Sequence, residues 1–437
     1  MILGDSNTFI EKIIIDSRLS RSNTLFIPII GEKYDGHIFM EEAYAKGCRN
    51  FLCDKNHSFL KKDINLIVVD DTTEALCNIA KGYKNRFNIP FIAVTGSVGK
   101  TSTKDIISSV LSTEYDVLKT QGNLNNNIGL SKTLLNLDNL NDIAVLELGM
   151  DKSLEIAYLS NMINPNIAVI TNIGMSHIMN FKDGQEGIYK AKMEIVDGLK
   201  DNGLLIVNGD DKFLGKLESN NSYKVIKCGF SSNNDIYCKS YNIDKYGTSF
   251  ICVYKNKEYE FSLNTIAKHN ILNAMFGVVI GLEYDIDYEQ IKKGLLNCKF
   301  SSNRLDISVT DKYVIINDTY NACYESVISA FDVLNNFEGR KVAILGDILE
   351  LGDYSKEIHQ KIGKNIDCDL LITIGNYSKY IGEGAVSNNF DLSKWYHFLR
   401  KEDFYNKVNE LLFKGDIVLA KASRAMKFDE IVEFLKN

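Results

Sequence analysis

The 437-residue sequence contains no apolar run near the roughly 18 residues that a membrane-spanning helix requires. Its first residues carry neither a basic region nor a long apolar stretch, so we expect no secretory signal peptide. The sequence has no excess of positive charge, because its 50 basic and 57 acidic residues give a net charge of −7. That balance disfavours a nucleic-acid-binding surface. These absences predict a cytoplasmic protein with no nucleic-acid partner and no membrane insertion.

Clustered metal ligands are also lacking in the sequence. The nine cysteines are scattered, and no Cys-x-x-Cys pair occurs. This distribution predicts reduced, mostly buried thiols rather than disulfides or a zinc site. Apolar residues make up 45% and charged residues 24% of the chain, as in ordinary globular proteins. The length suggests about two to four domains.

What the sequence does contain is a glycine-rich turn between an apolar strand and an amphipathic helix. The turn reads Thr95-Gly96-Ser97-Val98-Gly99-Lys100-Thr101-Ser102. Backbone N–H groups in such a turn cradle phosphate oxygens, Lys100 adds a positive charge, and the Thr101 hydroxyl can reach Mg²⁺. A regular phosphate-binding loop has four residues between its two glycines, which would place the first glycine at position 94, where Val94 stands. The turn therefore predicts nucleotide binding through a shorter loop, with two residues between Gly96 and Gly99.

Polar side chains stand at or just past the ends of two buried strands that follow this loop. Glu147 lies in the strand predicted at residues 143–149, and His177 follows the strand predicted at residues 167–174. Strands that alternate with helical stretches imply a parallel sheet, whose strand ends meet in one crevice. A buried glutamate is costly unless it is paired or bound to a metal, which favours a metal ligand at position 147. A histidine after a strand can be structural, but this position favours function.

Three α/β units follow one another, at residues 1–88, 89–303 and 304–437. The first contains Asp16-Ser17-Arg18 and Asp35-Gly36-His37, each of which could be only a strand end or a turn. The third has four apolar strands followed by helical stretches, and this second sheet could also bind ligand at its strand ends. In the second unit, His269, Asn270 and Asn273 would share one side of a helix's first turn. Lys192 has the local pattern of an ordinary solvated helix lysine.

In their order along the chain, these motifs resemble the Mur ligase family, the ATP-dependent ligases that build the peptide stem of bacterial cell wall. The resemblance covers the whole chain. It rests on the loop 95–101, Glu147-Leu148-Gly149, Thr171-Asn172-Ile173-Gly174 with His177, Ala191-Lys192 with Glu194-Ile195, His269-Asn270 with Asn273-Ala274, Arg304-Leu305, and Asn317-Asp318 with Tyr320-Asn321. Four further features are most similar to the member that joins D-alanyl-D-alanine to UDP-N-acetylmuramoyl-tripeptide. They are the loop followed by Lys104, Asn125–Gly129, Leu345-Gly346-Asp347 with Glu350-Leu351-Gly352 and His359, and residues 421–427.

The resemblance implies an α/β fold of three domains. A central phosphate-loop ATPase domain with a parallel sheet, residues 89–303, would be flanked by a small N-terminal α/β domain for the UDP-sugar substrate, residues 1–88. A C-terminal Rossmann-like α/β domain, residues 304–437, would bind the incoming amino acid or dipeptide. The implied cofactors are ATP and Mg²⁺. The implied partners are UDP-N-acetylmuramoyl-tripeptide and D-Ala-D-Ala, used by a monomer in the synthesis of peptidoglycan precursors and hence in cell shape and division.

The resemblance also implies a role for each matching residue. Catalysis would rest on Lys100, Glu147, His177 and a carbamylated Lys192, and the Mg²⁺ ligands would be Thr101, Glu147, His177 and Lys192. ATP would contact Thr95, Gly96, Ser97, Val98, Gly99, Lys100, Thr101, Ser102, Asn270, Asn273, Arg304 and Asp318. The muramoyl peptide and the dipeptide would contact Asp16, Ser17, Arg18, Asp35, His37, Asn126, Asn127, Asn321, Asp347, Ser423 and Arg424.

Two segments depart from the family pattern. The family's Tyr-Asn-Ala-Asn-Pro reads Tyr320-Asn321-Ala322-Cys323-Tyr324, and its Pro-Gly-Glu reads Ser153-Leu154-Glu155. The first departure leaves the amino component open: D-Ala-D-Ser, D-Ala-D-lactate or a single amino acid could replace D-Ala-D-Ala. A folylpolyglutamate-type ligase is disfavoured by Asp16-Ser17-Arg18, which suits a UDP-sugar. A nucleotide-dependent regulatory module is a further alternative, although no Asn-Lys-x-Asp guanine-reading motif occurs and the four catalytic residues are all present.

Overall fold

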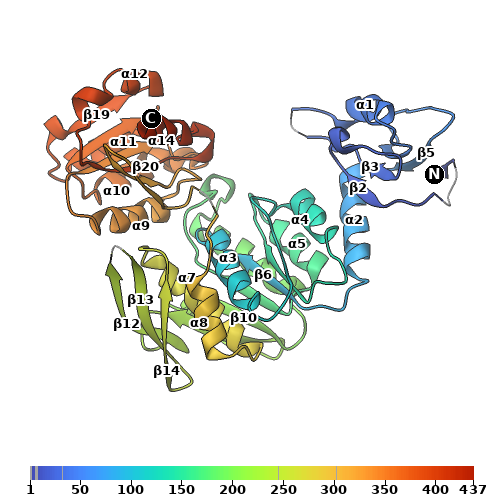
Figure 1. The fold of residues 1–437 in the computed structure, drawn as a ribbon, viewed down its shortest axis with the longest axis horizontal. Coiled ribbons are helices and arrows are strands. Elements are labelled where there is room, and N and C mark those ends of the chain that lie inside the picture. The colour runs from blue at the N-terminus through green and yellow to red at the C-terminus, as the bar shows by residue number, and fades with distance from the viewer. Residues whose placement is uncertain (1, 5–7, 32, 245, 302) are drawn as a thin grey trace. The chain divides into compact units, whose positions relative to one another are not determined.

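The structure, a computed structural model, describes residues 2–4, 8–31, 33–244, 246–301 and 303–437. The chain forms two compact units (Figure 1), the first of residues 1–89 and 123–140 and the second of residues 90–122 and 141–437. The chain thus leaves the second unit after residue 122, contributes a helix to the first, and returns at residue 141. The domain limits predicted at residues 88 and 303 treat each domain as one continuous segment of the chain. These limits stay a prediction.

The first unit is built on a five-stranded sheet in the order β1-β5-β4-β3-β2. Its strands are parallel except β1. They are β1 (Ile2–Leu3), β2 (Lys12–Ile14), β3 (Thr24–Phe26), β4 (Asn50–Asp54) and β5 (Asn65–Val69). The helices are α1 (Met40–Ala45), α2 (Thr72–Lys84) and α4 (Asn127–Leu134), with short 3₁₀ turns at Ser17–Leu19 and Gly36–Phe39. β3 and β4 are buried along their whole length, which explains the apolar residues Leu25-Phe26 and Phe51-Leu52-Cys53 within them.

Helix α4 belongs to the first unit through its packing on α2. The Tyr83 hydroxyl donates to the Leu137 carbonyl at 2.8 Å, and the Ser131 hydroxyl lies 3.4 Å from the Cys77 thiol. These partners lie far apart in the sequence, so no local pattern could predict that the helix after the phosphate-loop domain returns to the first sheet.

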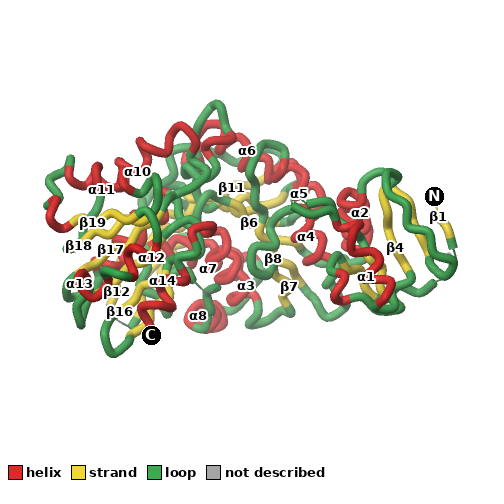
Figure 2. The backbone as a smooth tube through the Cα atoms, turned by 90° about the horizontal axis from the view of Figure 1, so that it is seen from above, coloured by secondary structure: helices red, strands yellow, loops and turns green. Residues whose placement is uncertain are grey.

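The second unit contains a nine-stranded sheet in the order β14-β13-β12-β11-β10-β9-β6-β8-β7. Figure 2 shows β11, β6, β8 and β7 following one another across this sheet. Strands β6 to β12 run parallel to their neighbours, and β13 and β14 extend the edge as antiparallel hairpins. The strands are β6 (Phe91–Thr95), β7 (Val117–Lys119), β8 (Ile143–Glu147), β9 (Ile167–Ile170), β10 (Gly203–Asn208), β11 (Tyr223–Gly229), β12 (Ile236–Asp244), β13 (Gly247–Tyr254) and β14 (Lys257–Leu263).

Five helices accompany this sheet, and α3 packs beside α7 and α8 (Figure 1). They are α3 (Lys100–Leu111), α5 (Glu155–Ile163), α6 (Gln185–Met193), α7 (His269–Glu283) and α8 (Tyr288–Leu296), with 3₁₀ turns at Ile178–Asn180 (η3), Glu194–Gly198 and Leu214–Lys216. A Cβ at Gly277 of α7 would come 2.8 Å from the Ile106 side chain of α3. This close packing fixes the helix of the phosphate loop against the helix that carries Asn270 and Asn273.

A six-stranded sheet completes the second unit, in the order β15-β16-β20-β17-β18-β19. Only β15 is antiparallel to its neighbour. The strands are β15 (Asp306–Val309), β16 (Val314–Asn317), β17 (Lys341–Gly346), β18 (Leu370–Ile374), β19 (Trp395–Phe398) and β20 (Ile417–Lys421). The helices are α9 (Tyr324–Asn335), α10 (Ser355–Gly363), α11 (Lys379–Val386), α12 (Lys401–Tyr405), α13 (Val408–Leu411) and α14 (Asp429–Lys436), with 3₁₀ turns at Gly352–Tyr354 (η6), Leu392–Lys394 and Arg424–Met426.

The sheets agree with the predicted α/β class. The strands predicted at residues 143–149 and 167–174 are found as β8 and β9, which end earlier than predicted, at Glu147 and Ile170. The nine cysteines are free thiols, and all except Cys368 are buried. None of the helices in the described part of the chain is long and apolar enough to cross a membrane.

Candidate active site

The phosphate loop joins β6 to α3 and requires glycine at two positions. Gly96 has φ 148° and Gly99 has φ 85°, both in the region where side chains are strained. At Gly96 the space is also filled, because an added Cβ would lie 1.8 Å from the Thr171 hydroxyl oxygen. Gly99 is the residue directly before helix α3, so the helix N-terminus faces the loop.

The amides of this loop already hold an oxygen atom. Asn172 Oδ1 accepts hydrogen bonds from Ser97 N at 3.1 Å and from Val98 N at 2.9 Å. A carboxamide oxygen there stands in for the phosphate oxygen that such amides bind. Lys100 Nζ donates to the Gly96 carbonyl at 2.8 Å, and burial lowers the pKa of this lysine while Glu147 opposes the shift. The loop thus has both the N–H donors and the cation that a polyphosphate needs.

Thr101 and Glu147 lie together at the start of α3 and the end of β8. The Thr101 hydroxyl donates to Glu147 Oε2 at 2.8 Å, and Glu147 is only 2% exposed. Arg304 Nη2 donates to the same Thr101 oxygen at 2.9 Å, so a cationic group lies against this pair of oxygen ligands. A hydroxyl and a buried carboxylate are the hard donors that Mg²⁺ takes, and the donor set fits that ion.

Lys192 is buried, contrary to its solvated local pattern. It lies in α6 and is 2% exposed, and no hydrogen bond or ion pair of its amine is found among the described residues. Burial and the positive charge of Lys100 lower its pKa well below the ordinary lysine value. The amine is therefore held toward its neutral form, which is the nucleophilic form.

His177 follows β9 and is held by two carboxylates. Its Nδ1 lies 2.7 Å from Glu350 Oε2 and 3.1 Å from Asp151 Oδ1. Glu350 comes from the loop after β17, so residues of both sheets meet at this ring. A carboxylate on one ring nitrogen leaves the other as a metal ligand.

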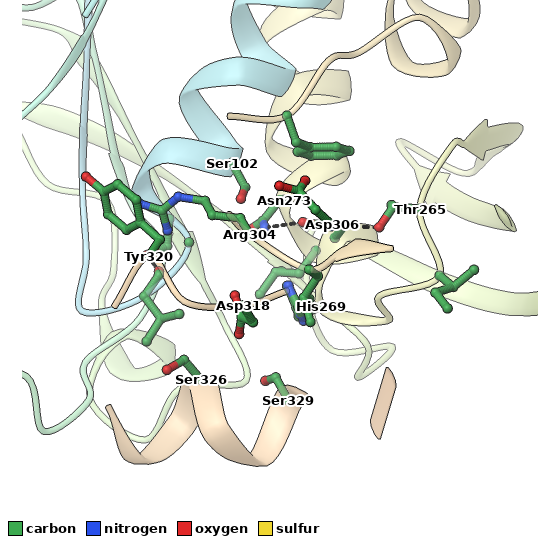
Figure 3. A pocket seen from close by; sticks show the side chains of 18 of the residues that line it. Ser102, Thr265, His269, Asn273, Arg304, Asp306, Asp318, Tyr320, Ser326 and Ser329 are labelled. Carbon is green, nitrogen blue, oxygen red and sulfur yellow. Dashed lines mark hydrogen bonds between the residues drawn. The ribbon is translucent and has the colours of Figure 1, made fainter. Parts of the chain in front are cut away.

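A cavity of about 460 Å³ opens beside the phosphate loop (Figure 3). Its lining includes His269, Asn270 and Asn273 of α7, with Arg304 and Asp318 from the segments before β15 and after β16. Asn273 Nδ2 donates to Asn270 Oδ1 at 2.9 Å, and Thr103 of α3 donates to Asn273 Oδ1 at 3.0 Å. Desolvation lowers the pKa of His269 to about 4, so its ring is neutral at pH 7. Amides, a neutral ring and an acidic residue next to a phosphate loop suit a nucleoside.

Comparison with known proteins agrees with this geometry. The chain matches the Mur ligase middle domain over residues 94–281 and the Mur ligase glutamate ligase domain over residues 303–424. It is 40% identical over 434 residues to the UDP-N-acetylmuramoyl-tripeptide--D-alanyl-D-alanine ligase of Bacillus subtilis strain 168, covering 98% of this chain and 93% of that protein.

The chain belongs to the Mur ligase family. Two solved structures share its fold. One is MurF from Acinetobacter baumannii, with a TM-score of 0.90, 29% identity and coverage of 98% and 93% of the two chains. The other is MurF ligase from Thermotoga maritima in complex with ADP, with a TM-score of 0.87, 25% identity and coverage of 99% and 98%. The predicted three-domain α/β architecture of a Mur ligase is thereby confirmed.

In this Mur ligase the predicted substrate residues of the second unit, Asn321, Asp347, Ser423 and Arg424, gather around the ends of β17 and β20. Ser423 Oγ accepts the N–H of Leu349 at 2.8 Å, and Asn321 Oδ1 accepts the N–H of Arg424 at 3.3 Å. The carboxylate of Asp347 is 3% exposed and accepts three backbone N–H groups, of Asn376, Tyr377 and Ser378, at 2.7 to 2.9 Å. Asp347 therefore shapes the turn that opens α11, and its predicted contact with the dipeptide stays a prediction.

The other residues predicted to contact the muramoyl peptide or the dipeptide lie in the first unit. Asp16 accepts the N–H of Arg18 at 3.0 Å and pairs with its guanidinium, which lowers the pKa of Asp16 to about 2. The Ser17 hydroxyl donates to Glu42 Oε2 at 2.6 Å. Asn126 caps α4 by accepting the N–H of Gly129 at 2.8 Å, and Asn127 is the first residue of that helix. These side chains have local structural partners, and their predicted substrate contacts stay a prediction.

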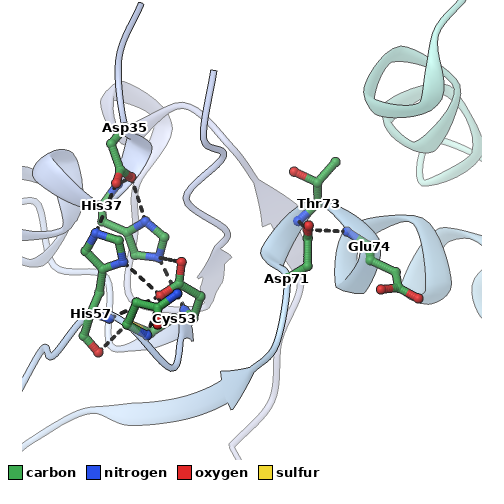
Figure 4. A network of polar contacts seen from close by, with 9 residues as sticks. Asp35, His37, Cys53, His57, Asp71, Thr73 and Glu74 are labelled. Carbon is green, nitrogen blue, oxygen red and sulfur yellow. Dashed lines mark hydrogen bonds and ion pairs between the residues drawn. The ribbon is translucent and has the colours of Figure 1, made fainter. Parts of the chain in front are cut away.

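Asp35 and His37 belong to a larger cluster that the sequence did not indicate (Figure 4). His57 lies between Asp35 Oδ2 at 3.0 Å and Asp54 Oδ1 at 2.8 Å, and its ring stacks on His37 with centroids 3.9 Å apart and planes 4° apart. Ligand atoms of Asp35, His37 and His57 lie within 4.8 Å of one another. One ion cannot lie in the planes of two stacked rings, so this geometry favours a proton-bridged cluster over a metal site.

Sequence reasoning missed two further residues that line the cavity beside the phosphate loop. Lys421 forms a buried ion pair with Asp318 and donates to the Asn321 carbonyl at 2.9 Å. The Tyr320 ring lies under the Arg304 guanidinium, with 3.9 Å between the ring centroid and the guanidinium carbon. This contact fixes the plane of the guanidinium. Both residues lie in motifs on which the resemblance to Mur ligases rests. For Lys421, the signal in the sequence was a lysine at the end of an apolar strand.

Proposed function

We propose that this Mur ligase joins D-alanyl-D-alanine to UDP-N-acetylmuramoyl-tripeptide, with ATP hydrolysed to ADP and phosphate, in the synthesis of peptidoglycan precursors. The observation that carries the proposal is the hydrogen-bonded set Thr101–Glu147–Arg304, because it joins the phosphate loop to a carboxylate and to the third predicted domain. The 40% identity with the ligase of Bacillus subtilis, over nearly both chains, supports this choice of substrates.

The chemistry follows from the groups at hand. A carboxylate is a poor electrophile, so the terminal carboxylate of the tripeptide attacks the γ-phosphate of ATP and ADP leaves. The resulting acyl phosphate is attacked by the free amine of the dipeptide, and phosphate leaves as the amide forms. The loop amides at Ser97 and Val98 and the Lys100 cation lie where they would stabilise charge on the transferred phosphoryl group.

We assign the nucleotide to the cavity beside α7, with adenosine near Asn270 and Asn273. Asn172 would leave the loop amides when phosphate oxygens take its place. Asp318 would accept from a ribose hydroxyl, and the ion pair with its buried partner Lys421 orients the carboxylate. The ADP complex of the Thermotoga maritima ligase supports a nucleotide in this fold.

We assign Mg²⁺ to the oxygen ligands of Thr101 and Glu147, and a second ion to His177 and carbamylated Lys192. Bound there, Mg²⁺ would neutralise phosphate charge and orient the reacting oxygens. The state of Lys192 supports its modification, because a buried amine held toward neutrality adds to CO₂ and releases one proton as the carbamate forms. The product is an oxygen ligand, the type that Mg²⁺ prefers.

The departure at residues 323–324 has a local explanation that leaves D-Ala-D-Ala in place. Cys323 is the N-cap of α9 and Tyr324 its first residue. The family's asparagine and proline are the residue types favoured at these two positions, so both sequences start the same helix. Cys323 N donates to Ser326 Oγ at 3.0 Å, which maintains the start of the helix without asparagine. The altered residues therefore give no reason to choose another amino component.

The assay that tests this function supplies ATP, Mg²⁺ and UDP-N-acetylmuramoyl-tripeptide with D-Ala-D-Ala, D-Ala-D-Ser, D-Ala-D-lactate or single amino acids. Phosphate release and product mass are measured. We expect D-Ala-D-Ala-dependent release and a product heavier than the tripeptide substrate by one dipeptide minus water. Release that is independent of any amino component, or absent with all of them, would contradict the ligase assignment. Preference for another dipeptide would keep the chemistry and change the substrate.

We propose further that the chain acts as a monomer in the cytoplasm. ATP and a UDP-linked substrate are cytoplasmic compounds, which supports that location. Each predicted ligand group, including the metal ligands and the nucleotide contacts, comes from one chain, which supports activity without a partner subunit. Sedimentation of the active enzyme at assay concentration tests the second statement, and a dimer would contradict it.

A further inference from the structure

Two glutamates from the region of the six-stranded sheet reach the segment that follows β9. Glu350 Oε2 lies 2.7 Å from His177 Nδ1, and Glu325 accepts the N–H of Met175 at 3.1 Å. The same segment carries Asn172, whose side chain bonds the phosphate-loop amides. It is therefore connected both to the phosphate loop and to the region predicted to bind the dipeptide.

The contact at His177 is held by strained backbone on both sides. His177 has φ 62° and Glu350 has φ 65°, and both are non-glycine residues in the left-handed region. Such conformations are unfavourable for residues with a side chain and persist where the surroundings fix them. Gly352, two residues after Glu350, approaches so closely that an added Cβ would lie 2.9 Å from the Met179 side chain. The loop 350–354 thus lies directly on the turn η3, whose N-cap is His177.

The chemical effect of this contact follows from the two nitrogens of imidazole. A neutral ring carries one N–H, and a carboxylate at Nδ1 keeps the proton on that nitrogen. Nε2 then presents its lone pair to a cation. Asp151 Oδ1, 3.1 Å from Nδ1, is a second acceptor for the same proton. Glu350 is the nearer of the two carboxylates, and it alone comes from the region of the six-stranded sheet.

We propose that Glu350 is a positioning residue for the cation site: it holds His177 in the Nδ1–H form, with Nε2 available to Mg²⁺, when the loop 350–354 lies on η3. The inference rests on the role proposed above for His177. It also connects the cation site to the dipeptide site, because Leu349, the neighbour of Glu350, donates its N–H to Ser423 Oγ at 2.8 Å. A bound dipeptide that displaces Ser423 would therefore move Leu349, and with it Glu350, through this hydrogen bond.

The first test measures binding of Mn²⁺, as a probe for Mg²⁺, by electron paramagnetic resonance in the presence of a non-hydrolysable ATP analogue. Glu350→Gln removes the charge and keeps the size, and we expect about tenfold weaker Mn²⁺ binding at one of the sites. Asp353→Asn is the matched control, because it removes an exposed carboxylate from the same loop. Equal affinities in Glu350→Gln and the wild type, or equal losses in both variants, would overturn the proposal.

The second test reads the ring itself in the resting protein, without nucleotide or metal. The chain has six histidines, so ¹⁵N spectra of labelled protein can assign His177 with a His177→Gln variant. We expect the Nδ1–H form in the wild type and a shift toward Nε2–H in Glu350→Ala. An unchanged tautomer would overturn the proposal. Failure of the ligase function would show elsewhere, as absence of dipeptide-dependent phosphate release by the wild type.

Discussion

Lys192 shows how far the environment of one residue can depart from its sequence context. Its neighbours along the chain are typical of an exposed helix, yet the side chain is 2% exposed and its pKa is lowered by burial and by Lys100. A buried amine without a partner is destabilising unless it is neutral or modified. A carbamate would remove this cost by exchanging the amine for a carboxylate-like group beside a cation.

Replacement of Lys192 by alanine should reduce kcat about 100-fold or more, because it would remove the carbamate oxygen proposed as a metal ligand near the transferred phosphoryl group. Short carboxylates such as acetate or formate, which fit the vacated space, should restore part of the rate. In the wild type, ¹³C-labelled bicarbonate should give a carbamate resonance that is absent from Lys192→Ala. Full activity of Lys192→Ala without added carboxylate would contradict the assignment.

His57 should titrate above the ordinary histidine value, because hydrogen bonding to Asp54 and the charges of Asp54 and Asp35 raise its pKa. Its contribution to folding is then complete below the unfolded pKa of about 6.5 and is lost as pH rises through the raised folded value. NMR titration of the histidines should show a lower His57 pKa in Asp54→Asn. The stability difference between the two proteins should shrink as the solution becomes alkaline. An unchanged His57 pKa would contradict the bridged arrangement.

At the scale of single elements, the phosphate loop combines two features that the sequence could only partly predict. The glycine turn and the following helix were visible as a pattern. Glycine is required at position 96 because Thr171, the residue directly after β9, fills the space that a side chain would occupy. The missing glycine at position 94 is explained by β6, where Val94 is fully buried within the sheet.

Gly96→Ala should abolish nucleotide binding, because its Cβ would lie 1.8 Å from the Thr171 hydroxyl and the backbone φ is 148°. ADP affinity measured by calorimetry should fall below detection. Gly82→Ala in α2 is the control, since no atom lies within 4 Å of the added Cβ. It should stabilise the protein by about 0.4–1 kcal/mol and leave ADP binding unchanged. Normal ADP binding by Gly96→Ala would contradict the described loop geometry.

The start of α9 offers a second test at this scale. Asparagine is a strong N-cap residue and cysteine a weak one, so Cys323→Asn should raise the free energy of unfolding by about 0.5–1 kcal/mol. Urea unfolding followed by circular dichroism measures this change. The KM for the dipeptide should stay within about twofold, because position 323 is assigned here to the helix and not to the substrate. A large rise in that KM would show that residue 323 contacts the amino component.

At the scale of the whole molecule, sequence periodicity predicted the α/β class, the strand that carries Glu147 and the strand that precedes His177. The rest depends on contacts between distant parts of the chain. The return of residues 123–140 to the first unit, the pairing of His177 with Glu350, and the stacking of His57 on His37 join segments that no local pattern connects. The resemblance to Mur ligases supplied the role of Lys192, which the residues alone did not indicate.

The central claim is that the γ-phosphate of ATP passes to the carboxylate of the muramoyl peptide. It is tested most directly with UDP-N-acetylmuramoyl-tripeptide carrying ¹⁸O in its terminal carboxylate. Through an acyl phosphate, one labelled oxygen stays bonded to phosphorus when the amine displaces phosphate. Mass spectrometry of the released phosphate should therefore find one ¹⁸O per molecule during D-Ala-D-Ala-dependent turnover. Phosphate without the label, at full amide formation, would contradict the account.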